Sequence, residues 1–157
     1  MAYRELDHTA DILLEISGNS IHELFCEAAR ALMDVLYPPT HNVKNSSTNI
    51  ALTTVPITVS IDAKDSWSND VNSKYREYEH LVQAFLSELL FLTETEYLVF
   101  LEFDIAITKT KVSGTVRGVP FDPLLHSGGI GVKGISYYDL AITKAQSGYH
   151  LSIIYDI

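Results

Sequence analysis

Apolar residues recur at helical spacing between Ser20 and Leu36. The segment opens with a capping box, in which the Ser20 hydroxyl accepts a hydrogen bond from a first-turn amide and the Glu23 side chain reaches back. One broad apolar stripe continues to Leu36, and Pro38-Pro39 stops the pattern. We therefore expect an amphipathic helix that ends just before these prolines.

A second helical pattern begins near Tyr75 or Glu77 and runs to Thr93. Its apolar residues cover more than half of the helix circumference. So wide an apolar face predicts burial against a sheet on one side and another helix on the other.

Elsewhere apolar and polar residues alternate, which is the period of a strand with one buried face. The segments with strand character are residues 3–6, 12–16, 55–61, 98–108, 112–119, 135–143 and 149–157. We expect 98–108 to form a hairpin with 112–119, and 135–143 to form one with 149–157. Pro56 places the start of its strand at a sheet edge or outside the ladder.

The predicted order is β-α-β-α followed by an antiparallel, β-rich C-terminal half. This order indicates an α+β fold with the two main helices packed on a sheet. A length of 157 residues fits a single domain over residues 1–157.

Two places depart from the regular pattern. The alternation slips between Tyr137 and Leu140, which predicts a β-bulge near Tyr138-Asp139. Residues 62–76 are polar around Trp67 and indicate a long surface loop. Trp67 either pins that loop as a hydrophobic plug or anchors a partner.

The charge balance narrows the range of partners. Eleven basic and twenty acidic residues give a net charge of −9. This argues against an unaided grip on nucleic acid, which needs Lys or Arg at the phosphates, and suits a cation or a basic protein surface. Apolar runs are too short to cross a bilayer, and the N-terminus does not resemble a signal peptide, so we expect a cytoplasmic protein without membrane contact.

Two carboxylates stand in apolar strand sequence at opposite ends of the chain. Asp11 borders residues 12–16, and Asp156 lies one residue from the end. A charge in such a place is costly unless it is paired or bound to metal. We hypothesise that Asp11, Asp156 and the terminal carboxylate of Ile157 hold a hard cation such as calcium or magnesium, since all three offer oxygen ligands. An isolated edge carboxylate remains the alternative for Asp11.

Residues 129–134 match the G-x-G-x-x-G pattern of dinucleotide sites. That motif requires a helix after it, whereas strand sequence follows here, so the glycines more plausibly allow a loop to approach another backbone. Lys133 in this loop is a candidate positive group beside an anionic site. His8 and His126 lie in the two loops with functional character, and each could act directly or through a structural hydrogen bond.

Several separated motifs resemble the archease family. They are His8-Thr9-Ala10-Asp11-Ile12, Ser87-Glu88-Leu89-Leu90-Phe91-Leu92, then Asp122-Pro123, His126, Gly129, Val132-Lys133 and Ser136-Tyr137, and the ending Ile154-Tyr155-Asp156-Ile157. The similarity covers nearly the whole chain and keeps the motifs in order. Departures are Gly131, where the family usually has Glu, Gly134, where it usually has Ala, and Tyr138, where it often has His.

The resemblance implies a function that composition alone does not reveal. Archeases are non-catalytic partners of the RtcB-type RNA ligase of tRNA splicing and RNA repair, and they promote attachment of guanylate from GTP to that ligase. Carried onto this chain, the resemblance implies a divalent cation at Asp11 and Asp156, calcium first and magnesium or manganese as alternatives. Lys133 matches the family's signature lysine.

Two competing functions stay open. In one, the chain is a stand-alone metal-dependent phosphoester hydrolase with Asp11 as ligand and Asp7 as base. In the other, it is a chaperone-like interaction module, in which Asp11 and Asp156 lie apart and bind nothing.

Overall fold

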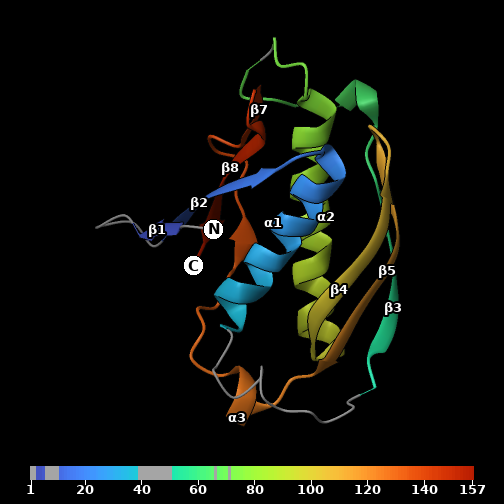
Figure 1. The fold of residues 1–157 in the computed structure, drawn as a ribbon, viewed down its shortest axis with the longest axis vertical. Coiled ribbons are helices and arrows are strands. Elements are labelled where there is room, and N and C mark those ends of the chain that lie inside the picture. The colour runs from blue at the N-terminus through green and yellow to red at the C-terminus, as the bar shows by residue number, and fades with distance from the viewer. Residues whose placement is uncertain (1–2, 6–10, 39–50, 66, 71) are drawn as a thin grey trace.

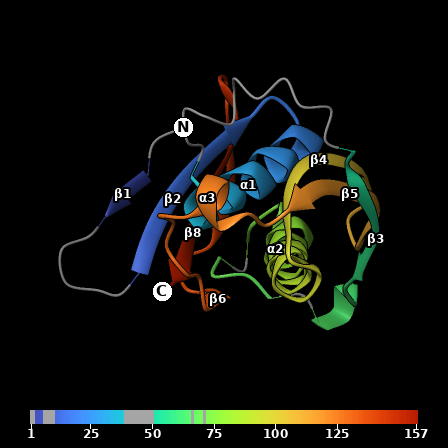
Figure 2. The same ribbon diagram turned by 90° about the horizontal axis from the view of Figure 1, so that it is seen from below.

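Two helices lie between two antiparallel sheets in the computed structural model, as Figure 1 shows. The structure describes residues 3–5, 11–38, 51–65, 67–70 and 72–157. The view from below in Figure 2 gives the same three layers, with both helices in the middle. The predicted α+β class is confirmed, while the extent of the domain over residues 1–157 stays a prediction.

The first sheet contains β1 (Tyr3–Glu5), β2 (Asp11–Gly18), β6 (Gly134–Ile135), β7 (Ala141–Ala145) and β8 (Gly148–Asp156). These strands have the order β1-β2-β8-β6, with β7 also paired to β8, and the second sheet has the order β3-β5-β4. The second sheet contains β3 (Thr53–Ser60), β4 (Leu98–Ile107) and β5 (Lys111–Pro120). The helices are α1 (Ile21–Leu36), α2 (Arg76–Glu96) and the short α3 (Pro123–His126), and a 3-10 turn covers Ala63–Asp65.

Helix α1 begins and ends where the sequence predicts. The amide of Glu23 donates to the Ser20 hydroxyl over 3.0 Å, and the Glu23 carboxylate accepts from the amide of Asn19 over 3.1 Å. The amide of Glu23 is one that a helix start leaves unpaired, whereas Asn19 lies one residue before the N-cap Ser20. At the other end, the amide of Tyr37 closes the last turn on the carbonyl of Met33.

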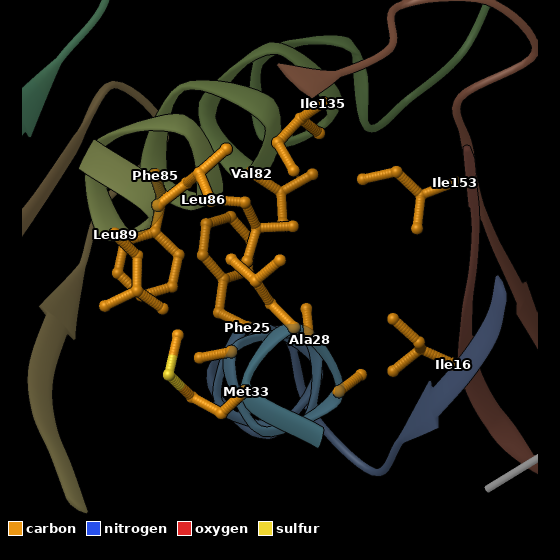
Figure 3. Packing of buried hydrophobic residues seen from close by; sticks show 14 of the residues in the cluster. Ile16, Phe25, Ala28, Met33, Val82, Phe85, Leu86, Leu89, Ile135 and Ile153 are labelled. Atoms are coloured by element: carbon orange, nitrogen blue, oxygen red, sulfur yellow. The ribbon is translucent and has the colours of Figure 1, made fainter. Parts of the chain in front are cut away.

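Helix α2 has a wide apolar face because it contacts both sheets as well as α1. In Figure 3 the rings of Phe25 from α1 and Phe85 from α2 lie together at the centre of the core, 5.9 Å apart between centroids. Ile16 and Ile153 face them from β2 and β8. The predicted contacts of α2 with a sheet and with another helix are confirmed, and α2 contacts the second sheet as well.

The hairpin of β4 with β5 is confirmed, and β3 is an edge strand that carries Pro56. The predicted strand over 135–143 is wrong. It is divided into β6 and β7 by a turn at residues 136–140, in which Asp139 takes a left-handed conformation with φ 55°. Five residues lie outside both strands, so the slip in alternation marks an interruption and not a single bulge.

Among the residues that the structure describes, no helix is both long enough and apolar enough to span a membrane.

Candidate functional site

Asp11 and Asp156 face each other across neighbouring strands. The antiparallel register of β2 and β8 pairs Asp11 with Asp156 and Ile12 with Tyr155. Ile12 and Tyr155 are buried in the core, so the two carboxylates project from the opposite, outer surface of the sheet. Directly opposed residues of such a pair have Cβ atoms roughly 4.5–5.5 Å apart. We call Asp11 and Asp156 the acidic pair.

The acidic pair places two like charges in direct opposition, which destabilises a sheet. Asp156 is exposed and Asp11 is half-buried. No ion pair to either carboxylate is formed by the side chains that the structure describes. The pair is therefore an electrostatic cost to the fold that a bound cation or a cationic partner would relieve.

The loop that precedes β6 completes this end of the sheet. Gly134 pairs with Asp156 on the side away from Asp11, and the amide of Lys133 donates to the Asp156 carbonyl over 2.7 Å. A Cβ on Gly134 would lie 3.7 Å from Oδ2 of Asp156, which is ordinary van der Waals contact. The alanine usual in the family would therefore fit, and the departure at Gly134 leaves the site's shape unchanged. Lys133 itself is exposed beside the pair.

The chain end is held by its side chain, since Ile157 is partly buried against the core. The acidic pair offers only oxygen donors, a set that suits a hard divalent cation. Within the described residues, no three His, Cys, Asp or Glu side chains gather as a metal-binding cluster. Asp7 and His8, for which the sequence predicts roles, lie outside the described residues.

His126 lies away from the acidic pair, on α3 at the lower end of the molecule in Figure 1. Its Nδ1 accepts a hydrogen bond from the amide of Asp122 over 2.9 Å. The buried imidazole packs against the rings of Tyr37 and Phe121 beside an apolar cavity of about 780 Å³. Of the two roles left open by the sequence, this geometry fits the structural hydrogen bond.

Burial makes stability depend on pH through His126. Desolvation lowers the pKa of this imidazole, and the nearby Asp122 carboxylate only partly opposes it. As pH falls, the unfolded chain therefore binds the proton before the folded chain does. The contribution of His126 to the free energy of unfolding is full above the unfolded pKa of about 6.5 and is lost as pH drops towards the lower folded pKa. We expect His126→Asn, which keeps an acceptor, to lose this dependence when urea unfolding is measured between pH 8 and 5. A stability advantage of wild type over His126→Asn that grows on acidification would contradict the assignment.

The glycine-rich loop packs on the end of α1 instead of opening a nucleotide site. The amide of Ile130 donates to the Val35 carbonyl over 3.0 Å, and a Cβ on Gly129 would overlap the carbonyl of Leu36. The loop then enters strand β6, so no helix N-terminus faces it. The close backbone approach predicted for the glycines of this loop is confirmed at Gly129, whereas Gly131 and Gly134 make none.

One buried acid was not singled out from the sequence. Glu79, on the first turn of α2, is 1% exposed. Its carboxylate accepts from the Ser68 hydroxyl over 2.7 Å and from the amide of Ile142 over 2.9 Å, so it ties the 62–76 loop to the start of β7. An acidic residue in a first helical turn is ordinary, and no sequence signal distinguishes this one.

The loop itself is pinned as the plug interpretation predicts. Trp67 is partly buried against the core, and its ring meets that of Tyr137 edge to face with centroids 4.6 Å apart.

Comparisons with known proteins identify a family for the chain. The model of the archease protein family (MTH1598/TM1083) matches residues 3–157. Protein archease of Pyrococcus furiosus is 29% identical over 93% of this chain and 91% of its own, and that of Pyrococcus abyssi is 31% identical with the same coverage.

Two solved structures share the fold. Protein 1598 of Methanobacterium thermoautotrophicum superposes with a TM-score of 0.65 at 23% identity, covering 97% of this chain and 96% of its own. An archease of Thermotoga maritima, described as a possible chaperone, gives a TM-score of 0.60 at 16% identity, covering 100% and 98%.

Proposed function

The chain belongs to the archease family, and from this premise we propose that it is a non-catalytic activator of an RtcB-type RNA ligase. In this role it promotes the guanylylation of the ligase from GTP, while the ligase itself joins the RNA ends. The observation that carries the proposal is the direct opposition of Asp11 and Asp156, which places two carboxylates at one exposed sheet end beside Lys133.

The strand pairing supports a preorganised site. Strand β8 is hydrogen-bonded to β2 on one side and to β6 on the other, so Asp156 is held from both sides. Sites built on paired strands keep their geometry better than sites on loops. Asp11, Asp156 and the terminal carboxylate of Ile157 would hold a divalent cation, calcium first and magnesium or manganese as alternatives. Such a cation supplies positive charge that neutralises phosphate oxygens.

Lys133 has a separate part in this proposal. Its side chain is exposed and its backbone amide is bonded to the Asp156 carbonyl, so the tip would offer both a cation-binding pair and a positive group for an anionic phosphate. The absence of a carboxylate at Gly131 leaves this positive group less neutralised than the family pattern would have it.

Asp11→Asn tests the proposal without a folding artefact. Because the substitution removes one of two opposed like charges, we expect stability to be kept or raised while ligase stimulation falls about ten-fold, the loss typical of weakening a metal site. Multiple-turnover RNA ligation with GTP by an RtcB-type ligase measures the second effect. Asp104→Asn, an exposed carboxylate on β4 of the other sheet, is the matched control and should stimulate normally. Undiminished stimulation by Asp11→Asn would sink the proposal.

The chaperone-like alternative is favoured by the description of the Thermotoga relative as a possible chaperone. That alternative predicts Asp11 and Asp156 to be distant, whereas their strands pair them directly. The hydrolase alternative predicts turnover of phosphoester substrates by the purified protein alone, which a hydrolysis assay on a generic phosphoester without any ligase detects.

A further inference from the structure

Two adjacent tyrosines are exposed on the turn between β6 and β7. Tyr137 is 53% exposed and Tyr138 is 70% exposed. We call residues 136–140 the tyrosine turn. Single apolar side chains on a surface need no explanation, but two large, exposed rings on one short turn offer much aromatic area to a partner.

The tyrosine turn is braced by residues far away in the sequence. The Asn69 side-chain amide donates to the carbonyls of Tyr137 and Leu140, over 2.9 and 3.0 Å. The Trp67 ring packs edge to face on Tyr137, and Glu79 fixes the segment that carries both bracing residues through its bond from Ser68. Trp67 and Asn69 thus brace the tyrosine turn.

The backbone of the turn is also strained in a defined way. Asp139 has φ 55°, a left-handed conformation that is uncommon for a residue with a side chain. The hydroxyl of Ser136 accepts from the amide of Tyr138 over 3.1 Å and stabilises this shape. Such strain persists where the surroundings enforce it, and it gathers at ligand and partner sites.

The tyrosine turn follows β6, the strand that pairs with the Asp156 end of β8. The amide of Ser136 donates to the carbonyl of Ile154 over 2.9 Å, two residues from Asp156. At about 3.3 Å per residue, Tyr137 lies within roughly 10 Å of Gly134 along the chain. A protein interface of standard size covers about 800 Å² on each partner, so one docked protein would reach both features.

Charge decides between the classes of partner. Neither the tyrosine turn nor residues 67–70 contain Lys or Arg, and they carry the exposed carboxylates of Asp139 and Asp70. A phosphate backbone would be repelled there, whereas guanidinium groups stack on tyrosine rings and pair with carboxylates. Tyrosine is also enriched among the residues that dominate protein interfaces.

We propose that the tyrosine turn docks a basic, arginine-containing surface of the partner ligase, next to the active site that the acidic pair serves. This inference rests on the proposed function and adds to it a second, aromatic contact whose role is binding and not activation of the nucleotide.

The test measures binding of the full chain to an RtcB-type ligase by calorimetry. Tyr138→Ala removes the more exposed ring of the tyrosine turn and is expected to weaken the complex about ten-fold or more, while Tyr138→Phe keeps the ring and should bind normally. Asp139→Asn keeps a residue tolerant of left-handed backbone and should reduce both affinity and its salt dependence. Tyr97→Ala is the matched control, since Tyr97 is 73% exposed and has a left-handed backbone like Asp139. It follows the C-terminal end of α2, whereas the residues that brace the tyrosine turn lie near the N-terminal end.

Each outcome has a distinct meaning. A ten-fold loss for Tyr138→Ala with normal binding of Tyr97→Ala supports the docking surface. Unchanged ligase binding by Tyr138→Ala overturns it and leaves the proposed function standing, as does an effect of Tyr138→Ala on single-stranded RNA binding alone. Failure of the wild-type chain to bind the ligase overturns the docking surface and the proposed function together.

Discussion

Replacing Glu79 with alanine is expected to lower the free energy of unfolding by about 3 kcal/mol. The carboxylate is 1% exposed and accepts from the Ser68 hydroxyl and the Ile142 amide. Alanine would leave a buried amide without its acceptor and a void beside α2, and each of these costs about 1–3 kcal/mol. Urea unfolding measures the loss, and faster proteolysis within residues 67–70 would report the released loop.

Two variants separate the hydrogen bonds from the charge and from helix propensity. Glu79→Gln should cost less than Glu79→Ala, because it has a similar shape and keeps one oxygen acceptor. A loss of about 1 kcal/mol should remain, because the amide nitrogen cannot accept from Ile142 or Ser68. Glu77→Ala changes an acid in the same helical turn that is not fully buried, and it should be nearly neutral. Equal losses for Glu77→Ala and Glu79→Ala would show that the buried bonds contribute nothing.

The helices and one hairpin follow from local patterns, whereas the interrupted strand does not. The capping box at Ser20 and the prolines after Leu36 act within a few residues, so the sequence defines α1 closely. The break between β6 and β7 depends on Asn69, which lies 68 residues from Tyr137. A bond over such a separation leaves only a weak mark in the local alternation, here the slip before Leu140.

The acidic pair shows a different limit. Two carboxylates in apolar strands at opposite chain ends suggested that Asp11 and Asp156 meet, and the register of β2 with β8 places them opposite each other. The glycine pattern of residues 129–134 did not reveal that Gly134 lies on a third strand and pairs with Asp156, because the same pattern also matches a nucleotide motif. His126 was ambiguous because a loop histidine looks the same whether its Nδ1 meets a ligand or the amide of Asp122.

A Gly129→Ala substitution is expected to be among the most damaging single changes in the chain. The new Cβ would overlap the carbonyl of Leu36 and lie 2.8 Å from Cδ of Pro38, neither of which belongs to a flexible side-chain end. The loop must move away from α1 and lose the bond from Ile130 to Val35, so we expect a loss of about 3 kcal/mol in urea unfolding. The same shift displaces Lys133 from the Asp156 carbonyl, so ligase stimulation at a temperature where the variant is folded should also fall.

Neighbouring glycines of the same loop provide the controls that make this result specific. A Cβ on Gly131 would meet nothing within 4 Å, so Gly131→Ala should be nearly neutral, in keeping with the Glu that the family usually has there. Gly128 is equally open but has φ 94°, so Gly128→Ala should cost about 1 kcal/mol from backbone strain alone. If all three variants were equally stable, the close approach of the loop to α1 would not be what brings Lys133 to the acidic pair.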